Sequence, residues 1–416
     1  MTAAVETLRR RSFLVSGGYA TISAGSAGLL LVLLTLAGRW LTSADYGRFR
    51  YALALTMIVE TVMDLGLGQV TVRAVARDRA GAGRLLRQVF GLKLVWVAIG
   101  LLLLAIVAPV LRSDPALVRL CYVMGLSSAL RSYLLTGRGV LQGMDRFDLE
   151  AVLVVSDRAL LLATGALALW LGDGAMALAL AFVASRAVML VASLALLRGA
   201  VGPVSPLFDR ASWRELQAAA IPLGFFMIAL NLYTYVDTVI LGVMRTDVET
   251  GWYAASYSVY EGITYAPAIM SAVLTPRLSS LFTTDRRAHR LLLRRSLLSA
   301  AALGVALGGV TALGARPLML LLFGDRYAAA IAPLRILSGG ALFVFCTWIL
   351  HAAAISTNLD RRLLATTIAG LSSNVILNLL FIPRWGISGA AWATVIAEAL
   401  TSALLLVQIL RRLREP

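Results

Sequence analysis

The sequence predicts an all-α polytopic membrane protein with about twelve transmembrane helices in two six-helix lobes. Three observations lead to this fold class. Hydrophobic residues make up 59% of the 416 residues and charged residues only 14%, whereas about 25% are charged in a soluble domain. Basic residues gather in loops on one side of the predicted membrane. An internal duplication divides the apolar sequence into two similar halves, which predicts two lobes.

The chain contains twelve apolar stretches long enough to cross a bilayer, which takes about 20 residues each. We expect spans to begin near residues 13, 49, 89, 116, 149, 175, 217, 252, 297, 331, 363 and 388. The first stretch, Phe13 to Ala37, follows three arginines in the manner of a signal peptide. It is too long for one, so we interpret it as an uncleaved first span.

The topology follows from the basic residues. Placing the N-terminus in the cytoplasm puts Arg9 to Arg11 and the basic segments 73–87, 277–295 and 411–414 on the inner side. Most of the 38 Lys and Arg residues then lie inside, so we expect both termini in the cytoplasm. The Arg-rich, Lys-poor usage indicates a GC-rich bacterial genome, and we expect the protein in the bacterial inner membrane. Topology and contact with anionic lipids explain the net charge of +16, so no nucleic-acid partner is expected.

The duplication is an ordered series of matches between the two halves. Seven identities fall in 31 aligned positions: Asp145-Arg146, Leu149, Leu162, Trp170 and Gly174-Ala175 recur as Asp360-Arg361, Leu364, Leu377, Trp385 and Gly389-Ala390. A weaker second match pairs Gly47 and Phe49 with Gly251 and Tyr253. The order of the parts carries more weight than their number, because apolar helices match by chance.

Two halves of six spans each enter the membrane with the same orientation. We therefore expect an N-lobe over 1–205 and a C-lobe over 206–416, related by a pseudo-two-fold axis along the membrane normal around a central cavity. The Pro- and Gly-containing segment 202–206 joins them. Such duplication is typical of alternating-access transporters, in which the substrate site lies between the lobes.

Enzymatic chemistry has little support in this sequence. Lys93 is the only lysine and does not stand in a phosphate-binding loop, which excludes an ATPase motif of that type. The predicted loops are too short for a folded catalytic domain. His289 and His351 are isolated, and Cys121 and Cys346 fall within spans. We therefore predict a transporter rather than an enzyme, with no metal and no cofactor.

Several short motifs follow one another along the chain in a recognisable order. They are Trp40–Gly47, Asp64–Leu67, Asp237 with Ile240–Gly242, Gly251–Ala255, Pro276, Ala332–Leu337, Asn374–Asn378, Ile382–Gly386 and Gly389–Thr394. This series resembles the polysaccharide-biosynthesis flippases. These are the O-antigen and capsule lipid-linked oligosaccharide translocases of the multidrug/oligosaccharidyl-lipid/polysaccharide exporter superfamily. The similarity covers nearly the whole chain, although motifs of this kind report fold more than substrate.

The resemblance implies a central cavity lined by spans one, two, seven and eight. The implied substrate is an oligosaccharide on a polyprenyl diphosphate, moved from the cytoplasmic to the periplasmic leaflet. Membrane lipids, and the polymerase and glycosyltransferases of the same pathway, are the implied partners. The related lipid II flippases usually carry two further spans, which this sequence lacks, and this disfavours a peptidoglycan role.

Arginines within spans are candidate ligands of the diphosphate. A charge within the bilayer costs a few kcal/mol, so each one needs a reason. The planar fork of Arg donates two parallel hydrogen bonds to a phosphate, which makes Arg131, Arg158 and Arg186 candidates. Alternatively, Arg158 or Arg186 pairs with Asp157 or Glu150 and ties helices together.

Carboxylates on the predicted cavity spans are candidates for ion coupling. Glu60, Asp237 and Glu261 lie on spans two, seven and eight, where a partly desolvated carboxylate can bind and release a proton during a transport cycle. Alternatively, Asp237 makes a structural hydrogen bond to a broken helix. We expect Asp64 to be a capping or hairpin residue, and Lys93 to extend to the cytoplasmic membrane surface.

Aromatic residues crowd spans seven and eight. Tyr257, Tyr260 and Tyr265 are candidates for stacking on sugar rings. We assign Trp252 and Tyr253 to the interfacial aromatic belt instead.

Asparagine side chains within the spans have two possible roles, sugar binding and bridging between helices. Asn231 is a candidate sugar ligand, whereas bridging between helices is an alternative for Asn231, Asn374 and Asn378.

A multidrug cation/proton antiporter of the same fold is the main rival function. A membrane glycosyltransferase or polymerase is a weaker one, because the large extracytoplasmic loop of such an enzyme is missing.

Overall fold

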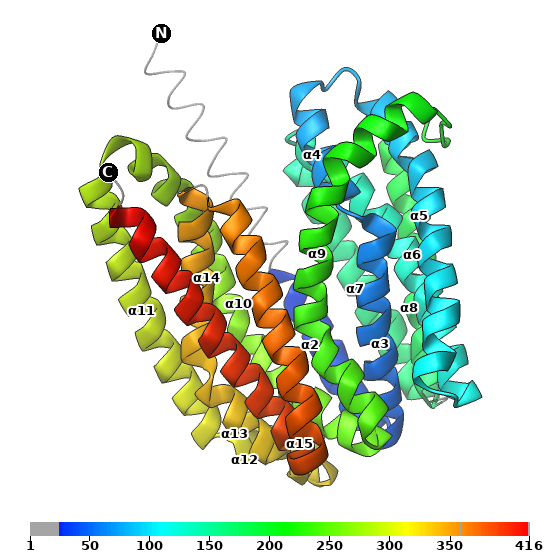
Figure 1. The fold of residues 1–416 in the computed structure, drawn as a ribbon. Helices are drawn as coiled ribbons and strands as arrows, with labels where there is room; N and C mark the ends of the chain where they lie inside the picture. The colour runs from blue at the N-terminus through cyan, green and yellow to red at the C-terminus, as the bar shows by residue number, and fades with distance from the viewer. Residues whose placement is uncertain (1–24, 173, 358, 415–416) are drawn as a thin grey trace. The chain divides into compact units, whose positions relative to one another are not determined.

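The chain folds into helices joined by short turns. The computed structural model describes residues 25–172, 174–357 and 359–414, and no strand occurs in these ranges. Figure 1 shows the helices in chain order. They are α2 (Ala27–Trp40), α3 (Ser43–Asp64), α4 (Leu67–Arg77), α5 (Ala82–Leu111), α6 (Pro115–Gly143), α7 (Phe147–Leu171), α8 (Gly174–Val201), α9 (Arg210–Met244), α10 (Asp247–Thr284), α11 (Arg286–Leu313), α12 (Ala315–Phe323), the 3-10 helix η1 (Asp325–Ala330), α13 (Ile331–Gly339), α14 (Ala341–Ser356) and α15 (Asp360–Arg414).

The helices account for about the predicted number of membrane spans. Six helices of the described chain are long and apolar enough to cross a membrane, or eight if each of two bent pairs, α3 with α4 and η1–α13 with α14, forms one span. The helices α6 and α10 also reach spanning length, with 29 and 38 residues. The shorter α2 and the second half of α15 supply the rest. The predicted fold class, an all-helical multi-pass membrane protein, is confirmed.

The 55-residue α15 is two helices rather than one. Gly386 has φ 56° and ψ −133°, a backbone conformation that is essentially restricted to glycine. Beyond it the chain runs back along itself, since the Gln408 side chain donates to the Thr366 hydroxyl at 2.9 Å. A Cβ at Gly389 would lie only 2.4 Å from the Phe381 carbonyl oxygen. Figure 1 draws the two halves as an orange and a red ribbon joined at one end.

The break between α3 and α4 is also set by backbone conformation. Leu65 and Gly66 both have positive φ, 42° and 78°, and the two helices meet at 41°. A Cβ at Gly66 would lie 2.8 Å from the Ala220 carbonyl oxygen. The backbone of α9 therefore packs directly against this break.

A second close approach joins the beginnings of α3 and α10. A Cβ at Gly47 would lie 1.8 Å from the Asp247 carbonyl oxygen, and a Cβ at Gly251 would lie 2.1 Å from the Ser43 carbonyl oxygen. The contact is reciprocal, because each glycine faces the carbonyl four residues before the other. These are the two glycines that the weaker sequence match pairs.

The chain divides into two compact units. The first unit comprises Ala52–Asn231 with the residues up to Leu34, and the second comprises Thr35–Tyr51 with Leu232–Pro416. Apolar side chains of α4 to α8, such as Val75, Leu86 and Leu153, form a core of the first unit. In the second unit α14 packs against α10, α11 and α15. The repeat boundary between residues 205 and 206 stays a prediction, and Arg9 to Arg11 and the expected start of the first span lie outside the described residues.

Candidate substrate and coupling sites

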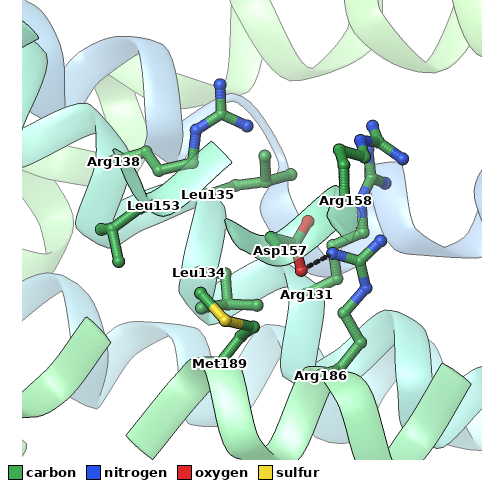
Figure 2. A pocket seen from close by; sticks show the side chains of 9 residues that line it. All are labelled: Arg131, Leu134, Leu135, Arg138, Leu153, Asp157, Arg158, Arg186 and Met189. Atoms are coloured by element: carbon green, nitrogen blue, oxygen red, sulfur yellow. Dashed lines mark hydrogen bonds and ion pairs between the residues drawn. The ribbon is translucent and has the colours of Figure 1, made fainter. Parts of the chain in front are cut away.

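Three arginines from three consecutive helices of the first unit line one small cavity. Arg131 lies on α6, Arg158 on α7 and Arg186 on α8, with Asp157 beside them. Figure 2 shows the guanidinium groups of the three arginines gathered on one side of this cavity, with Arg138 turned to the other side. The cavity volume is about 20 Å³, enough for a single water molecule.

Two of the three arginines have a carboxylate partner. The guanidinium of Arg131 donates to Glu60 Oε1 at 2.5 Å, and Arg186 pairs with Asp157. Both Glu60 and Arg186 are buried. Each retains one buried polar atom without a hydrogen-bond partner, Oε2 of Glu60 and Nε of Arg186. The alternative interpretation of Arg186, an interhelical pair with Asp157, is therefore confirmed, although Nε remains able to donate to a further group.

Arg158 is the exception. Within the part of the chain that the structure describes, neither a hydrogen bond nor an ion pair reaches its side chain, which is half-buried. The three guanidinium groups face only two carboxylates, so this cluster carries one positive charge that is not neutralised. A cation held among apolar helices calls for an anionic partner. A phosphate group meets that requirement, but it needs more room than this cavity offers.

Lys93 and Asp64 form a second charged cluster in the first unit. The Lys93 ammonium is fully buried and donates to Asp64 Oδ1 at 2.6 Å and to the Thr136 hydroxyl at 2.5 Å. The prediction that Lys93 extends to the membrane surface is wrong, because these partners satisfy the ammonium in the interior. Asp64 also accepts from the Gly68 backbone N–H in the first turn of α4 at 3.3 Å, which confirms it as a capping residue at the bend between α3 and α4.

Asp237 lies at the centre of a polar network in the second unit. Its carboxylate accepts from the Thr394 hydroxyl at 2.5 Å, from the Asn378 amide at 3.0 Å and from the Tyr253 hydroxyl at 3.2 Å. The Asn378 amide also donates to Asn374 Oδ1 at 3.0 Å. All five residues are buried. The network joins α9 and α10 to both halves of α15, as the structural interpretation of Asp237 and the bridging interpretation of Asn374 and Asn378 predicted.

The Asp237 carboxylate nevertheless has no cationic partner among the described residues. No Lys, Arg or His side chain there lies within ion-pair distance of it. The neighbouring Asn378 Oδ1 is buried without a hydrogen-bond donor. A buried carboxylate without a positive charge is costly. This group of oxygen atoms therefore suits a bound proton or a small monovalent cation.

The tyrosines of α10 follow one face of the helix. The ring centroid of Tyr257 lies 6.0 Å from that of Tyr253 and 6.0 Å from that of Tyr260. Glu261 and Tyr265 continue the row at four-residue spacing from Tyr257, and both are half-buried. The assignment of Tyr253 to the aromatic belt is wrong, because its hydroxyl is fully buried against Asp237. The Tyr260 hydroxyl is buried without a partner.

The predicted site residues thus fall into two groups. Arg131, Arg158 and Arg186 come together with Glu60 in the first unit, and Asp237 lies one hydrogen bond from the tyrosine row in the second. Asn231 joins neither group, because among the described residues its amide donates only to the Met227 carbonyl of its own helix, at 3.0 Å.

Sequence reasoning missed two contributors. Thr394 was noted only as part of a motif, and no isolated signal marks a hydroxyl that bonds a carboxylate 157 positions away. Arg50 is buried and donates to the Ser258 hydroxyl at 2.7 Å. Its signal was present, because an arginine at the beginning of an apolar span is itself unusual, but at the predicted edge of the span, near residue 49, it was not singled out as a buried charge.

Solved structures define the class of fold. The chain superimposes with a TM-score of 0.78 on an inward-facing multidrug resistance MATE family transporter of the MOP superfamily, at 14% identity over 93% of this chain and 94% of that one. The lipid II flippase MurJ in an inward closed conformation gives 0.75, at 13% identity over 95% and 88%. A MOP superfamily transporter from Pyrococcus furiosus gives 0.66, at 13% identity over 96% and 95%. The fold is that of the MOP superfamily.

Sequence comparison then gives the family. The model of the polysaccharide biosynthesis protein family matches residues 14–282, and the chain belongs to this family, which confirms the predicted resemblance. A probable flippase of Haloferax volcanii, AglR, is 29% identical over 184 residues, which are 41% of this chain and 37% of that protein. The chain therefore matches less than half the length of this relative.

Proposed function

We propose that the protein is a flippase that moves an oligosaccharide linked to a polyprenyl diphosphate across the membrane by alternating access. The polysaccharide biosynthesis family and the similarity to a probable flippase support this substrate class. The fold supports the transport mechanism, because its structural neighbours are transporters. The lipid II flippase MurJ has the same fold as this chain. Only the fold is taken from this comparison, and lipid II is not the substrate that we propose.

The single observation that carries the proposal is the unpaired Arg158 within its cluster. A diphosphate brings negative charge to a cluster that has one positive charge in excess. The Arg186 Nε and the Arg158 guanidinium supply donors that no other described residue uses. In this proposal Arg158 and Arg186 bind the diphosphate in a state of the transport cycle that widens their cavity, and Arg131 assists after its pair with Glu60 has been exchanged. The tyrosine row of α10, Tyr257, Tyr260 and Tyr265, supplies surfaces for the sugar rings.

Asp237 is the proposed coupling residue. Its carboxylate has three hydrogen-bond donors and no cationic partner in the part of the chain that the structure describes, so binding of a proton or a monovalent cation supplies the missing charge. Glu261 belongs to the tyrosine row and is a second candidate. Glu60 is the weaker candidate, since it already serves as the counter-ion of Arg131.

The proposed setting is the bacterial inner membrane with both termini in the cytoplasm, where the substrate moves from the inner to the outer leaflet. Two lobes, 1–205 and 206–416, would alternate around the substrate. The polymerase and glycosyltransferases of the same pathway would be neighbours in that membrane.

The test combines gene deletion with leaflet-resolved analysis of the lipid-linked oligosaccharide. Deletion should leave the glycolipid on the cytoplasmic leaflet, and the Arg158→Gln variant should restore less than about a tenth of wild-type flux, as loss of a charge-assisted bond of about 1.5–3 kcal/mol predicts. Arg158→Lys should restore an intermediate flux, since it keeps the charge but not the bidentate fork.

Arg198→Gln is the matched control, because Arg198 is an exposed arginine of the same unit. Equal flux in the Arg158→Gln and Arg198→Gln proteins would contradict a substrate role for Arg158. Unchanged surface glycan with altered drug tolerance in the deletion strain would instead indicate the antiporter. The net positive cluster argues against a cationic drug as its ligand.

A further inference from the structure

A large apolar groove lies in the second unit, and none of its lining residues belongs to the Asp237 network or the tyrosine row. Residues of the first turns of α11 and of the last turns of α15 line it. Both helices pack on α14, and Figure 1 shows where they run. Leu297 and Leu298 line it from α11, and Leu406, Leu410 and Leu413 line it from α15. Its volume is about 460 Å³, which is within the usual range of small-molecule sites.

Two arginines complete the lining of this groove. Arg290 and Arg294 are four residues apart, and hence on one face of α11. Both are exposed, and no carboxylate of the described residues forms an ion pair with either. The only polar groups that line the groove are thus cationic, and its remaining walls are leucine and isoleucine.

The position of the groove in the membrane follows from its charges. The first turns of α11 also carry Arg286, Arg287 and Arg295, and the end of α15 carries Arg411, Arg412 and Arg414. Eight arginines in these turns cannot all lie in hydrocarbon, so this end of both helices is at the boundary between lipid and water. The apolar walls extend from that boundary into the lipid layer, where a fatty acyl chain would be found.

We propose that this groove is a binding site for one anionic phospholipid, with its phosphate held by Arg290 and Arg294 and an acyl chain between the leucines of α11 and α15. Basic pockets between helices at a membrane surface bind lipids of this charge. Residues 1–24 are a poorer occupant, because Arg9, Arg10 and Arg11 have the same sign as the groove. A zwitterionic lipid has no net charge, so it would not neutralise the positive charge of Arg290 and Arg294.

The site is tested by native mass spectrometry of the purified, delipidated full chain. Increasing amounts of dioleoyl phosphatidylglycerol or dioleoyl phosphatidylcholine are added, and the affinity of the first bound lipid is measured. The wild type should bind phosphatidylglycerol about tenfold more tightly than phosphatidylcholine, as the attraction of two arginines predicts. The Arg290→Gln/Arg294→Gln variant should bind the two lipids equally.

Two matched controls separate the site from general surface charge and from general lipid contact. Arg73→Gln/Arg77→Gln removes two exposed arginines at the same spacing that do not line the groove, and it should retain the tenfold preference. Leu298→Trp should weaken both lipids by filling the groove. Val305→Trp, at an equally exposed position of α11 outside it, should not.

Equal binding of both lipids by the wild type would overturn the proposal, as would an equal loss of preference in the Arg73→Gln/Arg77→Gln control. Displacement of phosphatidylglycerol by soluble glycerol phosphate at equal concentration would also overturn it, because the acyl chain would then contribute nothing. The thermal midpoint, measured in the same samples, verifies that each variant is folded. If the double variant does not fold, the single Arg294→Gln variant should show a reduced preference, and an unchanged preference there would also count against the site.

Discussion

Lys93 shows how a single buried charge can stabilise the first unit. Its ammonium connects α5 to Asp64 at the end of α3 and to Thr136 on α6. Replacing it by methionine keeps the length of the side chain but leaves the Asp64 carboxylate without its cation. We expect Lys93→Met to lower the free energy of unfolding by about 3 kcal/mol, measured as a loss of thermal stability in detergent.

The second substitution Asp64→Asn provides the control for that prediction. It removes the orphaned negative charge, so Lys93→Met/Asp64→Asn should recover part of the lost stability. A double variant that is less stable than Lys93→Met would contradict the ion-pair explanation.

Asp237 offers a second prediction at the scale of one residue. Asp237→Asn keeps the size of the side chain and can still accept from Thr394 and Tyr253, but it removes the charge. We expect stability to stay equal or rise, because the desolvation of a buried carboxylate is removed, while flux no longer responds to the ion gradient. The measurement is glycolipid translocation in vesicles with and without an imposed gradient.

Asp45→Asn is the matched substitution for that experiment, since Asp45 is an aspartate at the beginning of α3 whose hydrogen bonds stay with nearby Thr42. Gradient-dependent flux that persists in Asp237→Asn would assign coupling to another residue.

Individual residues were predictable where they stand out chemically. Arg131, Arg158 and Arg186 are conspicuous because charges are rare in apolar sequence, and the structure brings them together. Their partners were less predictable, because Glu60 lies 71 positions from Arg131 and Asp157 lies 29 positions from Arg186. The separation of two residues in the sequence does not reveal such contacts, because they depend on how the helices pack.

Among the elements, the close approach of α3 and α10 depends on having no side chain at two positions. We expect Gly47→Ala to lower the free energy of unfolding by about 3 kcal/mol, because its Cβ would overlap the Asp247 carbonyl and push the helices apart. Thermal unfolding of the purified protein measures this loss. Gly309→Ala should be neutral or slightly stabilising, since a Cβ there would meet no described atom within 4 Å beyond its own stretch of helix backbone and alanine favours a helix.

The turn within α15 gives another prediction for an element. Gly386→Ala places a Cβ where φ is positive, so we expect a loss of about 1–3 kcal/mol from backbone strain. Gly199 of α8 has open space around it and serves as the comparison. Equal stability of Gly386→Ala and Gly199→Ala would show that the hairpin does not depend on this conformation.

Long elements were more predictable than short ones. The expected starts at 116, 149 and 175 lie within two residues of α6, α7 and α8, because each begins where a loop ends and an apolar run starts. The short helices α4, α12 and η1 were not foreseen. Their apolar residues continue the pattern of the neighbouring spans, so only backbone conformation, as at Leu65 and Gly66, separates them.

At the scale of the whole molecule, the distribution of charge predicts the topology. Both termini should be cytoplasmic, because the basic segments would otherwise have to cross the membrane. A green fluorescent protein fused after Pro416 should fluoresce, and alkaline phosphatase at the same position should be inactive. Active phosphatase at that position would contradict the predicted topology and the proposed direction of transport.

The whole-molecule organisation was predicted in kind rather than in detail. Composition and duplication predicted a helical membrane transporter fold, and the structural neighbours confirm it. The compact units differ from the repeat in their limits, since Thr35–Tyr51 belongs with the second unit and residues 206–231 with the first. Repeats record how a sequence was duplicated, whereas compact units record which helices pack together, and α3 and α9 contribute to both units.

The reciprocal meeting of Gly47 and Gly251 has the geometry of a homodimer interface. When one residue lies on a two-fold axis, it meets its own copy, and each copy makes the same contact in the opposite direction. Under the duplication that the sequence predicts, a protein of half this length would have associated through that glycine with a second identical subunit. Fusion of the two copies would then turn an association that depends on concentration into one fixed within a single polypeptide.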